Sequence, residues 1–255
     1  MVGLWEGVGV KDHAAHEAYD NLLASIGDRA DTIGPKRLAS HWPHVGKNYR
    51  GLVIAGQALQ GWDPAVAGAR WHAADARTPE GRAAILERTQ TWFADAADPV
   101  GVIATLGNRK GSPFWTLCRD VVETQEPDGP GPWYSRFAWA NVYPVGPDEP
   151  PGSPGGPLRD AQDQHVGGLL SALLDDLDAR RVVIISGPEY WRYAAQTPAF
   201  SSLACQAFPL LHGGRVDGRT ILVGYHPTYA RRKHVGAAEY ATRITQAIVA
   251  IEQER

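Results

Sequence analysis

The fold is decided by a short stretch, Gly51-Leu52-Val53-Ile54-Ala55-Gly56-Gln57, in which four consecutive apolar residues stand between two glycines. A continuous apolar run with this punctuation favours a strand that is buried on both faces, as in a parallel sheet. Such sheets bind their ligands in crevices just beyond the carboxyl ends of the strands. The segment after Ile54 is therefore the first place where we expect a functional site.

Further apolar runs extend this pattern along the chain. Strands are predicted over 137–145, 181–188 and 219–227, whereas the run 100–106 fits a strand or a helix equally well. Apolar spacing and end signals predict helices over 11–27, 79–94, 113–122, 159–178, 188–196 and 236–253. The alternation predicts one α/β domain over residues 1–255, with three α/β/α layers around a central, mainly parallel four-stranded sheet. We expect a helical lead-in over 1–50 whose basic part, 34–50, is rich in loops, an insertion-like segment over 62–105, and an irregular loop over 146–158.

The composition is that of an ordinary globular protein. The chain has 255 residues, 44% of them hydrophobic, and a net charge of −3. It has no apolar run long enough to cross a bilayer and no signal peptide at its start, so we expect a cytoplasmic protein without membrane contact. Its two cysteines are too few for a zinc or iron–sulfur site, so we expect no metal and no cofactor. We also expect a monomer.

Polar residues stand at the ends of three predicted strands. They occur in Gly56-Gln57-Ala58, Asn141-Val142-Tyr143-Pro144 and His226-Pro227-Thr228. Because the carboxyl ends of parallel strands share one edge of a sheet, Gln57, Asn141 and His226 should converge on one crevice. A fourth segment, 107–115, places an Asn before Phe114-Trp115 at the start of a predicted helix.

These four motifs, in this order, resemble those of the uracil-DNA glycosylase superfamily. The resemblance covers roughly residues 50–250 and implies that the protein flips a base out of DNA and hydrolyses its glycosidic bond. It implies that His226 stabilises the departing base, that Asn141 reads its edge and that Phe114 stacks on it. Cleavage of this bond builds negative charge on the base, so a preorganised donor facing a base carbonyl would accelerate it. Without the resemblance, each of these residues also has a structural reading: a strand-end cap for His226, a turn residue for Asn141 and a core aromatic for Phe114.

The first motif departs from the superfamily pattern. The best-known members carry a carboxylate or Asn where this chain has Ala58, and that residue positions the attacking water. Ala58 can only line the base pocket, and Gln57 could orient a water without deprotonating it. Asp63 is the nearest acid downstream and becomes a catalytic candidate if its loop folds back. The cysteines of the iron–sulfur branches are also absent.

The residues after His226 are suited to phosphate. The resemblance implies that this loop enters the duplex, with Tyr229 as a wedge and Arg231, Arg232 and Lys233 on the backbone. Arg109 and Lys110, before Phe114, could add phosphate contacts. A basic run of this kind is otherwise simply a solvated face.

The sequence therefore predicts a monofunctional DNA glycosylase. The excised base stays open, and a modified base that marks foreign DNA is one hypothesis. Two alternatives remain: a catalytically weak protein that binds a lesion or modified base, and an enzyme that acts on free nucleosides or nucleotides.

Overall fold

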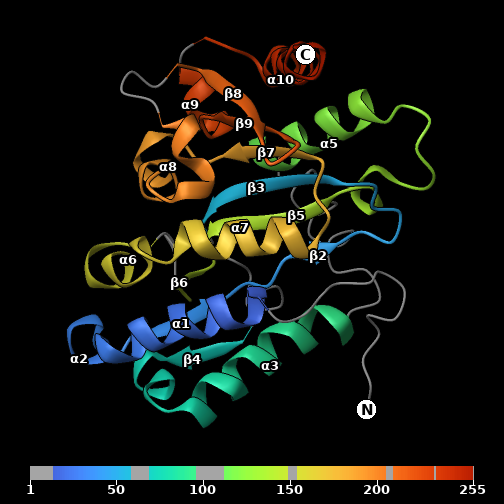
Figure 1. Ribbon diagram of the computed structural model, residues 1–255. Helices are drawn as coiled ribbons and strands as arrows, with labels where there is room; N and C mark the ends of the chain where they lie inside the picture. Colours follow the sequence, from blue (N-terminus) through green and yellow to red (C-terminus); the bar gives the residue numbers. More distant parts are fainter. Residues whose placement is uncertain are drawn as a thin grey trace. The chain divides into compact units, whose positions relative to one another are not determined.

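A computed structural model describes residues 14–58, 69–95, 112–148, 154–204, 209–232 and 234–254 (Figure 1). Contacts within the chain divide it into two compact units, each made of three stretches. Unit 1 comprises residues 1–42, 58–97 and 143–178, and unit 2 comprises 43–57, 98–142 and 179–255. Each unit is described by itself, and the single domain over 1–255 stays a prediction.

Unit 2 is built on a mixed six-stranded sheet in the order β2-β5-β3-β7-β9-β8. Its strands are β2 (His44–Val45), β3 (Leu52–Ala58), β5 (Ala138–Tyr143), β7 (Arg181–Ile185), β8 (Leu211–Val216) and β9 (Arg219–Gly224). The strands β3, β7 and β9 run parallel, with Leu52 opposite Arg181 and Arg181 opposite Thr220. At the edges, β2 pairs antiparallel with β5, and β8 pairs antiparallel with β9. The α/β class and the parallel centre are confirmed, but the sheet has six strands rather than the predicted four.

Burial explains why the central strands read as unbroken apolar runs. Val53, Ile54 and Ala55 of β3 are fully buried, as are Val182 to Ile185 of β7. Strands covered on both faces need no polar alternation. The two additional strands were missed because they are edge strands with weaker apolar patterns.

The helices of unit 2 are α5 (Pro113–Gln125), α8 (Pro188–Ala194), α9 (Pro227–Arg232) and α10 (Ala237–Gln253), with two 3₁₀ helices, η2 (Trp133–Ser135) and η3 (Pro198–Leu203). Helix α10 packs against α5 and also contacts β8 and β9 (Figure 1). The short α9 contacts both α5 and α10. These contacts bring α5 close to α9, the helix that follows β9.

Unit 1 combines helices with an antiparallel sheet in the order β4-β1-β6. Its elements are α1 (Ala14–Asp28), α2 (Ala30–Ile33), β1 (Arg37–Ser40), β4 (Arg70–His72), η1 (Ala73–Arg77), α3 (Pro79–Asp95), β6 (Val145–Pro147), α6 (Gly156–Asp163) and α7 (Val166–Asp176). Helix α1 lies at its centre, where Tyr19, Leu22, Leu23 and Ile26 are fully buried and contact several neighbouring elements.

Three predicted segments differ from the structure. The stretch 34–50, expected to be rich in loops, contains β1 and β2. The stretch 146–158, expected to be irregular, contains the end of β6 and the start of α6. The helix predicted over 159–178 is two helices, because the chain turns at Gln164 and His165 between α6 and α7. Within the ranges given above, no helix combines the length and apolar character needed to cross a membrane.

Candidate functional site

The carboxyl ends of the three parallel strands are level with one another. Gly56 lies opposite Ile185, and Ile185 lies opposite Gly224. Immediately beyond this line, the backbone N–H groups of Ser186 and Gly187 both donate to the carbonyl of Gly224, at 3.1 and 2.9 Å. The strand ends therefore form one edge of the sheet in unit 2, as the sequence pattern requires.

Gly56 is a point of close packing at this edge. A Cβ atom placed on Gly56 would lie 2.8 Å from Oδ1 of Asn141 and 3.4 Å from Cε2 of Phe114. Asn141 comes from β5, the neighbour of β3 in the sheet, and Phe114 comes from the first turn of α5. The absence of a side chain at Gly56 thus allows an amide and an aromatic ring from distant parts of the chain to approach the same strand end.

Asn141 is buried with part of its hydrogen-bonding capacity unused. Its residue exposure is 6%, and its Nδ2 has no hydrogen-bond partner in the described part of the chain. A buried amide N–H left without a partner costs about 1–3 kcal/mol, so native proteins rarely keep one without a reason. Within the described residues, the Nδ2 of Asn141 is therefore a buried donor whose hydrogen-bonding capacity is unused.

Phe114 and His226 present parallel ring planes. Their centroids are 6.3 Å apart and the planes differ by 6°. Phe114 also makes an edge contact with Trp115, whose ring in turn makes an edge contact with Trp139 of β5. The Phe114 ring is therefore held between the sheet edge and His226, and it remains partly exposed.

His226 is held by the turn that follows it. Its carbonyl accepts the N–H groups of Tyr229 and Ala230 at 2.8 and 3.2 Å, and its Nδ1 accepts the N–H of Thr228 at 3.3 Å. Since Nδ1 is an acceptor, the proton of the neutral ring stands on Nε2. Burial lowers the pKa of His226 from its ordinary value, which favours this neutral form. The imidazole is thus both a helix cap and a neutral N–H donor.

The remaining predicted site residues are less constrained. Gln57 is half-buried. Because successive side chains of β3 leave from opposite faces of the sheet, that of Gln57 leaves from the face opposite the one where Gly56 meets Phe114. Tyr229 stacks on Tyr225 at 4.1 Å between ring centroids, and Arg231 and Arg232 are exposed on α9. Outside the described residues lie Asp63, Arg109, Lys110, Lys233 and the side chain of Ala58.

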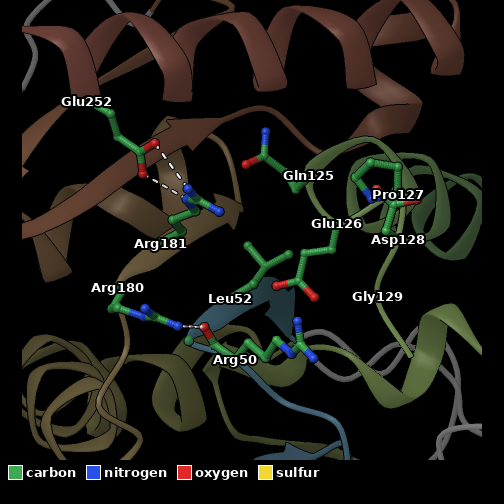
Figure 2. A pocket seen from close by; sticks show the side chains of 11 residues that line it. Arg50, Leu52, Gln125, Glu126, Pro127, Asp128, Gly129, Arg180, Arg181 and Glu252 are labelled. Atoms are coloured by element: carbon green, nitrogen blue, oxygen red, sulfur yellow. Dashed lines mark hydrogen bonds and ion pairs between the residues drawn. The ribbon is translucent and has the colours of Figure 1, made fainter. Parts of the chain in front are cut away.

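A concave region lies at the other end of these strands, where β3 and β7 begin (Figure 2). It is a pocket of about 410 Å³ at the start of β3 and β7, bounded also by the C-terminal ends of α5 and α10. Its charged lining residues are Arg50, Glu126, Asp128, Arg180, Arg181 and Glu252. No sequence motif indicates this pocket, apart from the basic character of the segment that contains Arg50.

Two of the charges of this pocket form an ion pair with each other. Arg181 donates to both carboxylate oxygens of Glu252, at 2.7 and 3.2 Å, and Arg180 donates to the carbonyl of Arg50. The hydrogen bond to Glu252 raises the pKa of Arg181. These contacts tie the start of β7 to the end of α10 and to the segment just before β3. We assign the pocket a structural role, and the carboxyl edge remains the candidate functional site.

Sequence reasoning overlooked two contributors to that edge. In the sequence Gly56 only bounds the strand and opens the first motif, although its missing side chain is what admits Asn141 and Phe114. Tyr225 was read as the end of a strand, although it stacks on Tyr229. The aromatic spacing around His226 could have indicated the second feature, whereas the first requires knowing which strands are neighbours.

Among the described residues, no group of three or more His, Cys, Asp or Glu side chains is placed to hold a metal ion. Cys118 is a buried free thiol whose pKa burial raises, so it is a core residue. In comparisons with known proteins, no protein-family model matches the chain, and no curated protein sequence matches it.

Proposed function

We propose that this protein is a DNA glycosylase that binds a base turned out of DNA at the carboxyl edge of the unit 2 sheet. The observation that carries the proposal is the convergence of Asn141, Phe114 and His226, which lie far apart in the sequence. An amide donor without a partner among the described residues, a flat apolar ring and a neutral imidazole N–H are groups that suit recognition of a nucleobase. The motif resemblance to the uracil-DNA glycosylase superfamily supports the same reading.

In this proposal the base lies on the face of Phe114. Stacking of a base on an aromatic side chain contributes about 1–3 kcal/mol. The ring centroids of Phe114 and His226 are 6.3 Å apart and the rings are parallel. This fits an imidazole that lies about 3.5 Å above the phenyl plane and is displaced sideways by about 5 Å. A base on Phe114 would then lie in the plane of the imidazole, where its edge can accept a hydrogen bond. The Nδ2 of Asn141 would donate to a second acceptor on that base.

The chemistry assigned to His226 follows from its protonation. Breaking the glycosidic bond leaves its electron pair on the base, while water adds to the sugar carbon and releases a proton. A neutral Nε2–H group that faces a base carbonyl stabilises the resulting anion by donating a hydrogen bond to it. Removing one preorganised donor of this kind typically lowers the rate by about 10²–10³.

The proposal also includes the partner, the compartment and the oligomeric state of the protein. DNA is the partner, Arg231 and Arg232 contact phosphates, and the protein acts in the cytoplasm as a monomer. The three-layer α/β/α arrangement is part of it too. Gln57 and Asp63 remain the candidates for handling water.

The test is an abasic-site assay on oligonucleotides that carry a panel of modified bases, with strand breaks at abasic sites revealed by hot alkali. We expect wild-type protein to produce abasic sites with at least one base. His226→Ala should lower the rate about 10²–10³-fold, and Asn141→Ala should weaken both binding and turnover. His72→Ala, which removes an exposed histidine of unit 1, is the matched control and should leave the rate unchanged.

One second candidate is favoured by Ala58, which stands where the superfamily pattern has a water-positioning residue. A protein with this substitution could bind the extruded base without releasing it. This candidate predicts base-selective DNA binding that needs Asn141 and Phe114, with no abasic product at any time. If neither binding nor cleavage responds to changes at Asn141, Phe114 and His226, both candidates are wrong.

A further inference from the structure

The two tyrosines that flank His226 form a stacked pair. Tyr225 directly follows β9, and Tyr229 lies in the first turn of α9. Their ring centroids are 4.1 Å apart, their planes differ by 19°, and both residues are partly exposed. Tyr229 therefore packs onto Tyr225 and is not extended away from the protein as a wedge would be.

The pair is fixed in position by its surroundings. The carbonyl of Tyr225 accepts the hydroxyl of Tyr240 at 2.9 Å. Gly187, which has a φ of +78°, lies against the Tyr225 ring, where a Cβ atom would be 3.3 Å from Cδ1. No other residue would adopt this backbone and leave this space without strain. Tyr225 is therefore held from the side of β7 as well as by α10.

The same turn connects the pair to His226. The N–H of Tyr229 donates to the carbonyl of His226 at 2.8 Å, and the N–H of Thr228 donates to its Nδ1. The Tyr229 ring and the imidazole thus belong to one turn of backbone, three residues apart. Arg231 and Arg232 are exposed on the next turn of the same helix.

An aromatic platform beside a base-binding residue, followed by two exposed guanidinium groups, matches a nucleotide with a free base face and a phosphate. We infer that the Tyr225–Tyr229 pair is a stacking platform for the base adjacent in the strand to the one held at His226, so that the preferred partner is single-stranded DNA. In a duplex that neighbouring base is covered by its own stack and pairing partner, whereas in a single strand its face is open. The inference rests on the proposed function only in placing the first base at His226.

The test compares changes in the protein with changes in the DNA. Binding is measured by fluorescence anisotropy with labelled single strands that carry the best base from the panel above. In matched strands the nucleotide on the 5′ or the 3′ side of that base is replaced by an abasic spacer. The protein variants are Tyr229→Ala and Tyr229→Phe. Tyr193→Ala is the control, because Tyr193 is a partly exposed tyrosine of unit 2 on a different helix, α8.

We expect the spacer on one side to weaken wild-type binding about 5- to 150-fold, the range that stacking of one base provides. Tyr229→Ala should cause the same loss with the intact strand and almost no further loss with that spacer. Tyr229→Phe and Tyr193→Ala should bind like the wild type. Wild-type protein should also bind the single strand more tightly than the duplex with the same sequence.

Two outcomes overturn the inference. In the first, Tyr229→Ala weakens binding equally for the intact strand and for both spacer strands. In the second, the wild type binds the duplex more tightly than the single strand. Thermal unfolding of each variant identifies a loss of binding that comes from misfolding, and Tyr229→Phe keeps the ring if Tyr229→Ala does not fold. If abasic product forms but Tyr229 and the neighbour act independently, the proposed function stands without the platform. If the two are coupled in binding but no abasic product forms, the platform stands without the glycosylase.

Discussion

Replacing Gly56 with alanine tests the packing on which the site depends. The new Cβ atom would lie 2.8 Å from Oδ1 of Asn141, closer than carbon and oxygen approach in folded proteins, and 3.4 Å from the ring of Phe114. Because Asn141 is 6% exposed, its amide has little free space and must shift by several tenths of an ångström. The substitution therefore displaces the proposed donor without removing it.

The size of the effect follows from two opposing contributions. Overpacking of a well-packed site costs about 1–3 kcal/mol, while a Gly→Ala change recovers about 0.4–1 kcal/mol through the unfolded chain. We expect a net loss of about 1–2 kcal/mol, which corresponds to a Tm lowered by roughly 2–8 °C for a chain of this size. Activity should fall by about 10- to 100-fold, because misplacement of a catalytic group by about 1 Å can cost as much as 10²-fold.

Thermal unfolding and single-turnover abasic-site formation measure the two effects, and a double-mutant cycle assigns them. Asn141→Ala removes the atom that the new Cβ meets, so Gly56→Ala should cost much less stability in that background. Gly168→Ala on α7, where an added Cβ meets nothing within 4 Å, is the control and should be neutral or stabilising. Wild-type Tm and rate in Gly56→Ala, or strictly additive losses in the cycle, would refute the proposed packing.

Three further predictions use other features of unit 2. The pKa of His226 lies below its ordinary value, so the rate should hold as the pH falls through about 6.5 and decline only at lower pH. The free energy of unfolding should already decrease as the pH falls below about 6.5, because the unfolded chain takes up the proton first. A pH–rate profile and unfolding measured over the same pH range check both expectations. Asn141→Leu replaces a buried amide whose Nδ2 lacks a partner in the described part of the chain, so the free energy of unfolding should stay level or rise by about 1 kcal/mol while base binding is lost; a loss above 2 kcal/mol would mean that the amide has a structural role. Glu252→Gln weakens the ion pair with Arg181, in which the side chains of Glu252 and Arg181 are 32% and 36% exposed. It should lower the free energy of unfolding by less than about 1 kcal/mol in urea at low salt and leave base binding unchanged. Altered base binding would contradict the structural role assigned to the pocket.

The centre of the unit 2 sheet could be predicted because its strands are buried on both faces. The runs Leu52–Ala55, Val182–Ile185 and Ile221–Val223 are apolar without interruption, and each has a glycine within two residues of its end. The edge strand β8 was missed because Gly213 and Gly214 break its apolar pattern. A local signal was nevertheless present. Val216 pairs with Arg219 around Asp217-Gly218, the dipeptide typical of a tight hairpin.

The proximity of Asn141, Phe114 and His226 could be predicted from the sequence, but its geometry could not. Asn141 and His226 stand near the ends of apolar runs, and in a parallel sheet such ends are expected at one edge. The contact of Gly56 with Asn141 depends on β5 being the neighbour of β3, and strand order is a property of the whole sheet. The tautomer of His226 depends on a single backbone N–H, that of Thr228, which no residue pattern encodes.

The pairing of Leu52 with Arg181 has a consequence for how the protein is made. A ribosome releases the apolar strand β3 roughly 130 residues before the partner β7 that shields it, and contacts so distant in sequence form slowly. During that interval β3 lacks one of its two neighbours in the sheet, and its apolar side chains are exposed to other nascent chains. We therefore expect refolding from denaturant to be slow and to yield less native protein as concentration rises, and early binding of a chaperone to β3 would improve recovery.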